Sequence, residues 1–335
     1  MNNIFLYSPK ELTTDAFLAW YVKEFDRTTA SQKLASEFFY GLGLCDSAND
    51  LICDIHVSKQ EKNTDLIIRY SVNGQKTQAL FENKTYTSTH SDQLKRYSEN
   101  FPDFHYYKYM KLGYINFAEK KHAKDSGYDV IDVCQLRSAL GNYPSNLIAD
   151  QYREFLEIQF IKVQNEIRND LIKDNKYQLF ENSEAQQYIL STLHENIDQQ
   201  IPYLYFKHSA NSGGTPWTEL DIAKRENAYG DKTEYLFWRI DKRGKGYYLR
   251  LNQYSYIDAQ YWPQKEKNLR ILRDFVSSLF KKHGLAIGQI SNRGIKETEI
   301  AILFFVDNHL SKITPLLPLL SQDIFDFYSS FNKWV

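Results

Sequence analysis

Two apolar segments joined by an Asn-Gly pair constrain the fold of this chain more than any other feature. Residues 65–72 read Asp-Leu-Ile-Ile-Arg-Tyr-Ser-Val, Asn73-Gly74 follow, and residues 77–83 form a second apolar segment. An Asn-Gly pair between two such segments is a strong local signal for a tight β-hairpin. We therefore predict two antiparallel neighbouring strands within a sheet.

The charged residues at one end of this hairpin suggest a cation site. Successive side chains of a strand point to opposite faces, so Glu82 and Lys84 share a face and Asn83 points to the other. An antiparallel return brings Asp65 and Glu82 to the same end of neighbouring strands. Two carboxylates and an ammonium suit a hard divalent cation and an activated water, as in phosphodiester hydrolysis. In isolation, a solvated pair on an edge strand explains Glu82 and Lys84 better than a cation site does.

Length, charge and cysteine content narrow the class of protein. A chain of 335 residues favours two domains, and a net charge of -1 gives no overall basic field for nucleic acid. No apolar run approaches a membrane span, and no charged leader with a cleavage site opens the sequence. Cys45, Cys53 and Cys134 lack metal-type spacing and favour reduced thiols. We expect a cytoplasmic protein without a membrane partner.

Periodicity predicts alternating helices and strands on both sides of the hairpin. Helices are expected over residues 11–25, 31–42, 93–97, 150–174, 183–198 and 269–284, with a strand followed by a helix over 129–140, and strands over 53–58, 105–115, 234–241, 247–253 and 300–306. Residues 207–217 predict a loop, and the glycines after Lys242 predict a hairpin turn rather than a phosphate contact. We place one domain at 1–150, a helical connector at 151–205, and an α+β domain for recognition or partner binding at 206–335.

Three segments taken together resemble the PD-(D/E)XK nuclease superfamily, whose members have the restriction-endonuclease-like fold. They are the helix from Glu11 to Trp20, the strand end Glu82-Asn83-Lys84, and the Gln-Leu-x-x-Tyr helix from Gln93 to Tyr97. They are similar to a bacterial branch with the same order of motifs, although Thr64-Asp65 stands where Pro-Asp would. The resemblance covers roughly the first third of the chain. It implies an α/β fold with a central mixed sheet flanked by helices, followed by a C-terminal α+β region.

The resemblance also implies a role for each residue. Asp65, Glu82 and the backbone carbonyl of Asn83 would bind Mg²⁺, with Mn²⁺ as a substitute. Lys84 would orient or help deprotonate the attacking water. The supporting residues would be Glu11 at the metal or a water, Gln93 at the scissile phosphate or a water, and Tyr97 along the substrate pocket. Apart from the resemblance, His90 follows the strand closely enough to reach the site, although a loop histidine is more often incidental.

The expected function is therefore a magnesium-dependent endodeoxyribonuclease that acts on DNA. Its hydrolysis would leave a 5′-phosphate and a 3′-hydroxyl. Defence against foreign DNA such as phage DNA would be its use, with a homodimer or an accessory defence protein as partner. The alternatives are a catalytically inactive nuclease-fold protein in nucleic-acid binding or complex assembly, and an interaction protein whose motifs are coincidental. Under those alternatives Glu11 favours a helix start, and Gln93 and Tyr97 pack one turn apart.

Overall fold

The chain divides into two units, residues 1–165 and 166–335. A computed structural model describes residues 3–7, 11–25, 29–88, 92–141, 146–196, 205–244, 246–290 and 296–330. The division falls inside α7 (Lys162–Asp170). Residues 151–205, predicted as a connector, are thus shared between the two units. None of the described helices combines the length and the apolar character that a membrane span requires.

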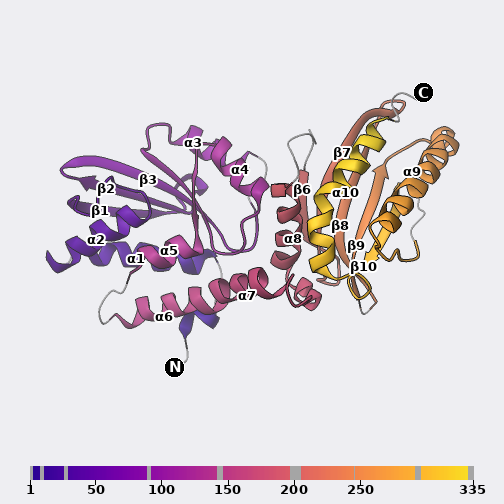
Figure 1. The fold of residues 1–335 in the computed structure, drawn as a ribbon. Helices are drawn as coiled ribbons and strands as arrows, with labels where there is room; N and C mark the ends of the chain where they lie inside the picture. Colours follow the sequence, from indigo (N-terminus) through magenta and orange to yellow (C-terminus); the bar gives the residue numbers. More distant parts are fainter. Residues whose placement is uncertain are drawn as a thin grey trace. The chain divides into compact units, whose positions relative to one another are not determined.

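A five-stranded mixed sheet forms the centre of the first unit (Figure 1). Its order is β1 (Ile52–Lys59), β2 (Leu66–Val72), β3 (Gln75–Lys84), β4 (Tyr106–Lys111) and β5 (Asp129–Asp132). The pairs β1–β2 and β2–β3 are antiparallel, whereas β3–β4 and β4–β5 are parallel. The predicted hairpin is confirmed: Val72 pairs with Gln75 around Asn73 and Gly74, whose φ angles of 50° and 83° suit a tight turn.

Helices cover both faces of this sheet. One face packs against α1 (Glu11–Glu24), α2 (Thr29–Gly41), α5 (Val133–Ala139) and α6 (Leu147–Leu156). The other packs against α3 (Gln93–Asn100) and α4 (Phe117–Asp125). Strand β2 serves both cores because Leu66 and Ile68 belong to the first cluster and Ile67 to the second. The predicted α/β class, with a central mixed sheet flanked by helices, is therefore confirmed.

The second unit contains an antiparallel sheet with helices, as the predicted α+β region required. The strand order is β10 (Glu297–Phe304), β9 (Gly246–Ser255), β8 (Lys232–Arg243), β7 (Pro216–Tyr229) and β6 (Tyr205–Ala210). The longer helices are α8 (Ser183–Asn196), α9 (Trp262–Lys282) and α10 (Leu310–Ser330). The short helices η5 (Tyr177–Glu181) and η6 (Ala259–Tyr261) precede α8 and α9.

The link between α6 and α7, near the end of the first unit, is a π-helical turn, η4 (Glu157–Ile161).

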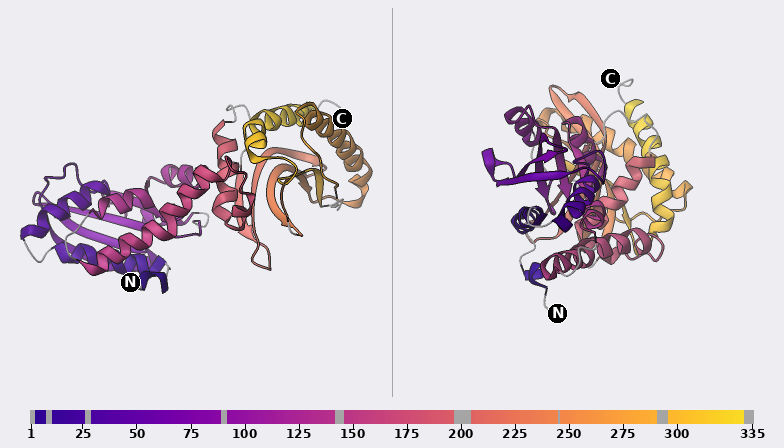
Figure 2. Two further views of the ribbon diagram at one scale, coloured as in Figure 1. Left: turned by 60° about the horizontal axis from the view of Figure 1, so that its bottom comes forward. Right: turned by 90° about the vertical axis from the view of Figure 1, so that its left-hand side faces the viewer.

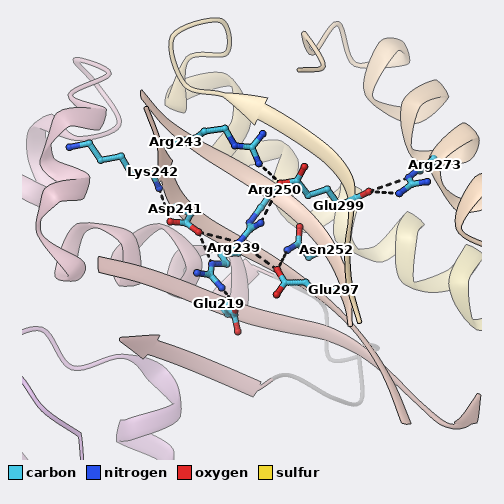
Figure 3. A network of polar contacts seen from close by, with 10 residues as sticks. All are labelled: Glu219, Arg239, Asp241, Lys242, Arg243, Arg250, Asn252, Arg273, Glu297 and Glu299. Carbon is cyan, nitrogen blue, oxygen red and sulfur yellow. Dashed lines mark hydrogen bonds and ion pairs between the residues drawn. The ribbon is translucent and has the colours of Figure 1, made fainter. Parts of the chain in front are cut away.

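The two faces of this second sheet differ in character. Helices α9 and α10 cover one face (Figure 2). On that face Trp238 stacks on Phe280 and donates its indole N–H to Ser321 Oγ at 2.8 Å. The other face carries a network of arginines and carboxylates (Figure 3). Strand alternation separates the two, since Trp238 and Arg239 are consecutive residues of β8.

The prediction of a loop over residues 207–217 is wrong. Lys207 and Ser209 lie in β6, where they pair with Glu219 and Trp217 of β7. Only residues 211–215 turn, closed by the Asn211 N–H, which donates to the Thr215 carbonyl at 2.9 Å. The glycines belong to that short turn, and Pro216 opens β7, a position where a strand tolerates proline.

Candidate functional site

Strand β3 supplies three consecutive residues to two different layers of the first unit. Glu82 and Lys84 share one side of the strand, where Gln93 of α3 donates to Glu82 and Lys84 Nζ lies 2.5 Å from Glu82 Oε1. Asn83 projects toward α1, where its side-chain amide donates to Asp15 Oδ1 at 3.1 Å and to the Glu11 carbonyl at 3.2 Å. Period-two alternation of the strand therefore sets the geometry of the site.

Asp65 joins the site from the start of β2. Leu66 pairs with Phe81, so Asp65 lies beside Glu82 at the end of the hairpin. The backbone N–H of Asn83 donates to Asp65 Oδ2 at 2.7 Å, which fixes the carboxylate against β3. The two carboxylates predicted as metal ligands are thus neighbours.

Helix α3 supports Glu82 from the opposite side. Gln93 Nε2 donates to Glu82 Oε1 at 2.7 Å and to the Tyr97 hydroxyl at 3.0 Å. Tyr97 is buried in the core beneath α3. Gln93 and Tyr97 therefore come together with the site, and in this arrangement they hold the Glu82 carboxylate in place.

Helix α1 brings Glu11 to the end of β3. Glu11 Oε1 accepts hydrogen bonds from the Thr85 N–H and the Thr87 hydroxyl, each at 3.0 Å. Glu11 Oε2 lies 4.0 Å from Lys84 Nζ. The predicted residues of the site that the structure describes thus converge, whereas His90 lies outside the described residues.

Burial makes the charges of this site costly. It raises the pKa of Glu82 to about 8, helped by the neighbouring charge of Asp65. Burial likewise raises the pKa of Asp65. For Lys84, burial lowers the pKa, but the hydrogen bond from Lys84 to Glu82 and the nearby carboxylates outweigh it, so the pKa is raised overall. Lys84 is therefore held as an ammonium between acidic groups.

The donor set fits a hard cation such as Mg²⁺. Glu82 is fully buried, and its Oε2 atom has no hydrogen-bond partner among the residues that the structure describes. A buried carboxylate oxygen without a partner is costly, and a bound cation would satisfy it. The described ranges contain no group of three His, Cys, Asp or Glu side chains arranged for a metal ion. Asp65, Glu82 and the Asn83 carbonyl would thus leave several positions to water, as Mg²⁺ prefers.

Asp15 is a residue of the site that the sequence reasoning did not single out. It is almost completely buried, and burial together with the charge of Asp65 raises its pKa to about 7. Its hydrogen bond to the Asn83 amide tethers the middle residue of the strand end to α1. The available signal was its position four residues after Glu11, which places both side chains on one face of a helix.

Comparison with family models, with curated proteins and with solved structures finds no match to this chain.

Proposed function

We propose that this site hydrolyses phosphodiester bonds of DNA with the help of Mg²⁺, and that the first unit has a restriction-endonuclease-like core of the PD-(D/E)XK type. One observation carries the proposal. Asp65, Glu82 and Lys84 converge at a strand end, and a buried oxygen of Glu82 lacks a partner among the described residues. That combination is costly in a purely structural role, because the buried Glu82 carboxylate and the half-buried Asp65 carboxylate repel each other.

The residues divide the work of hydrolysis among them. Asp65, Glu82 and the Asn83 carbonyl would hold the cation, which when bound polarises a phosphate oxygen and makes a coordinated water more acidic. Lys84 offers an ammonium beside this position, where it orients the attacking water and balances the negative charge that grows on the phosphate. Glu11 Oε1 accepts hydrogen bonds from Thr85 and Thr87, which follow β3, and Glu11 Oε2 lies 4.0 Å from Lys84 Nζ.

Two further residues hold these groups in position by hydrogen bonds. Gln93 fixes the Glu82 carboxylate, and Asp15 fixes Asn83, whose backbone N–H in turn holds Asp65. Use against foreign DNA with a homodimeric or accessory defence partner stays a prediction, and so does the cytoplasmic location expected from the cysteines.

A catalytically inactive member of the same fold is the second candidate. Its support is that Glu82 Oε1 is already engaged by Lys84 at 2.5 Å and by Gln93 at 2.7 Å. A carboxylate oxygen engaged in this way is less available to a cation, and the protein would then bind nucleic acid or a partner without turnover.

The decisive experiment is a cleavage assay on the full chain. Supercoiled duplex DNA, single-stranded DNA and RNA are incubated with Mg²⁺ or Mn²⁺, and with EDTA as the metal-free control. We expect strand breaks in DNA only with metal, and their loss in Asp65→Asn and Lys84→Met. Glu99→Gln, which removes an exposed carboxylate from α3, is the matched control and should cleave normally. Binding of nucleic acid without breaks in any substrate would favour the inactive protein instead.

A further inference from the structure

The face of the second sheet opposite α9 and α10 carries an ordered set of charged and aromatic side chains. Strand pairing aligns them in rows across the sheet. Lys207, Glu219 and Arg239 form one row, and the next contains Asp221 and Phe237. The alternation that buries Trp238 under the helices places these residues together on the other side.

Arginines and carboxylates neutralise one another along part of this face (Figure 3). Arg239 Nη1 lies 2.9 Å from Glu219, and its Nε lies 3.0 Å from Asp241. Arg250 lies 3.1 Å from Asp241 and 3.5 Å from Glu297. The guanidinium groups are thereby occupied by carboxylates of the protein, which leaves them poorly suited to bind an anion.

A cavity of about 340 Å³ opens beside this network. That volume is at the lower end of the range for small-molecule sites. Its wall contains the rings of Tyr235, Phe237 and Tyr254. The charged residues of the wall are Lys207, Glu219, Asp221 and Glu297, so carboxylates outnumber the single ammonium.

Asp221 is the group that marks this cavity as a site. Its side chain is fully buried, and Lys207 Nζ lies 3.3 Å from its Oδ2 atom. Its Oδ1 atom has no hydrogen-bond partner among the described residues. A buried carboxylate oxygen on a cavity wall is an acceptor that a donor from a ligand would satisfy.

Lys207 shows what kind of group this environment stabilises. Its ammonium lies 5.1 Å from the centre of the Tyr205 ring and 5.9 Å from that of Tyr235, while it pairs with Asp221. The aromatic rings attract an ammonium through cation–π interactions, and the carboxylate attracts it through its opposite charge. The Lys207 side chain is 41% exposed whereas that of Asp221 is fully buried, so the lysine can leave toward solvent.

We propose that this cavity binds an organic cation, a primary ammonium or guanidinium on an apolar stem. The charged head displaces the Lys207 ammonium and donates to Asp221, and the stem packs between Phe237 and Tyr254. Glu297 at the rim accepts a second cationic end where the ligand has one. The same chemistry is presented by a free alkylamine and by a lysine or arginine side chain of a peptide.

Isothermal titration calorimetry of the full chain at 0.15 M salt tests this proposal. The probes are agmatine, n-butylamine, n-butanol and the peptide acetyl-Gly-Lys-Gly-amide. We expect the amines to bind with micromolar to millimolar dissociation constants and n-butanol not to bind. Binding of the amines together with the peptide identifies a protein-borne cation as a ligand, and binding of the amines alone identifies a free amine. Equal responses to n-butylamine and n-butanol, or no response to any cation, would overturn the proposal.

Two variants with opposite expected effects assign the binding to this cavity. Asp221→Asn should weaken agmatine binding about tenfold or more, because it removes the charged acceptor. Lys207→Met should strengthen it about tenfold, because it removes the competing internal cation. Asp307→Asn, an exposed carboxylate in the turn after β10, should leave it unchanged. Unaltered affinity in Asp221→Asn, or weaker binding in Lys207→Met, would exclude this cavity, and a gain of affinity cannot result from misfolding.

Discussion

The backbone N–H of Asn83 donates to the carboxylate of Asp65 at 2.7 Å. Asn83 stands between Glu82 and Lys84, so the strand that carries these two residues also fixes Asp65. A carboxylate fixed by the main chain does not depend on a side chain that can rotate away. It also stands next to Glu82, and the buried Glu82 and the half-buried Asp65 repel each other. The site is thus rigid and electrostatically costly, a combination that suits a cation-dependent function.

Asp65→Asn should separate function from stability. The change removes one of two repelling carboxylates but keeps an oxygen that can accept from the Asn83 N–H. We expect the metal-free variant to be more stable by about 1 kcal/mol, and we expect Mg²⁺ to raise the melting temperature of the native chain but not that of the variant. Thermal unfolding with EDTA and with Mg²⁺ measures both effects. Glu99→Gln is the control, and a destabilised Asp65→Asn variant would contradict the picture of repelling charges.

Gln93→Leu should lower turnover without abolishing it. Gln93 is a positioning residue, because its amide orients the Glu82 carboxylate from α3. Loss of such a supporting hydrogen bond typically costs about 10- to 100-fold in metal affinity or activity. We expect the apparent affinity for Mg²⁺ in the cleavage assay to decrease by a factor in this range. Tyr97→Phe, which only removes the second partner of the Gln93 amide, should show a smaller loss. An equal loss in both variants would argue that the effect is structural.

Lys265→Met should stabilise the second unit in a pH-dependent manner. Lys265 is fully buried in α9, and burial lowers its pKa to about 8, partly offset by the charge of Glu234. The folded state therefore holds this proton less tightly than the unfolded state. The resulting penalty is full below pH 8 and disappears as the pH rises toward the unfolded pKa of about 10.4.

The gain in stability of Lys265→Met should accordingly be largest near pH 7 and smaller by on the order of 1 kcal/mol near pH 9.5. Urea unfolding of native and variant chains at the two pH values measures the difference. Lys267→Met, an exposed change on the same helix, controls for the loss of a surface charge. A gain that does not vary between the two pH values would show that Lys265 titrates normally.

Ser321→Ala should destabilise the second unit by about 1–3 kcal/mol. The buried indole N–H of Trp238 donates to the Ser321 hydroxyl, and alanine would leave it without an acceptor. Chemical unfolding measures this cost. Ser278→Ala removes an exposed hydroxyl from α9 and should change stability by less than about 0.5 kcal/mol. Comparable losses in both variants would mean that hydroxyl removal, rather than the indole contact, is responsible.

Much of the first unit could be predicted because its signals are local. The Asn73-Gly74 turn determines the hairpin register, and the register determines which side of β3 each residue faces. Those two facts suffice to place Asp65, Glu82 and Lys84 together. Asp15 could not be assigned in the same way, because its role depends on how α1 packs over Asn83. Packing between a helix and a strand distant in the sequence leaves no periodic signal.

The second unit was less predictable because its sequence signals conflict with its structure. Helix α10 contains Pro315 and Pro318, which usually end or kink a helix, so its pattern was not recognised. Strands β8 and β9 lie where the sequence predicts them, but the ion pairs of Arg239 and Arg250 with Asp241 depend on strand pairing, which leaves no local signal. The glycine-rich turn between β6 and β7 conceals the two strand ends beside it.

The alternation within β3 has a consequence for how this chain tolerates change. Substitutions that keep the strand length leave each side chain facing its own layer. A deletion of one residue between the hairpin turn and Glu82 would rotate the strand end by half a repeat, turning the carboxylate toward α1 and the amide toward α3. The site is therefore sensitive to the count of residues in a short stretch of backbone, and single-residue deletions there should be far more damaging than the conservative replacement of any neighbouring apolar side chain.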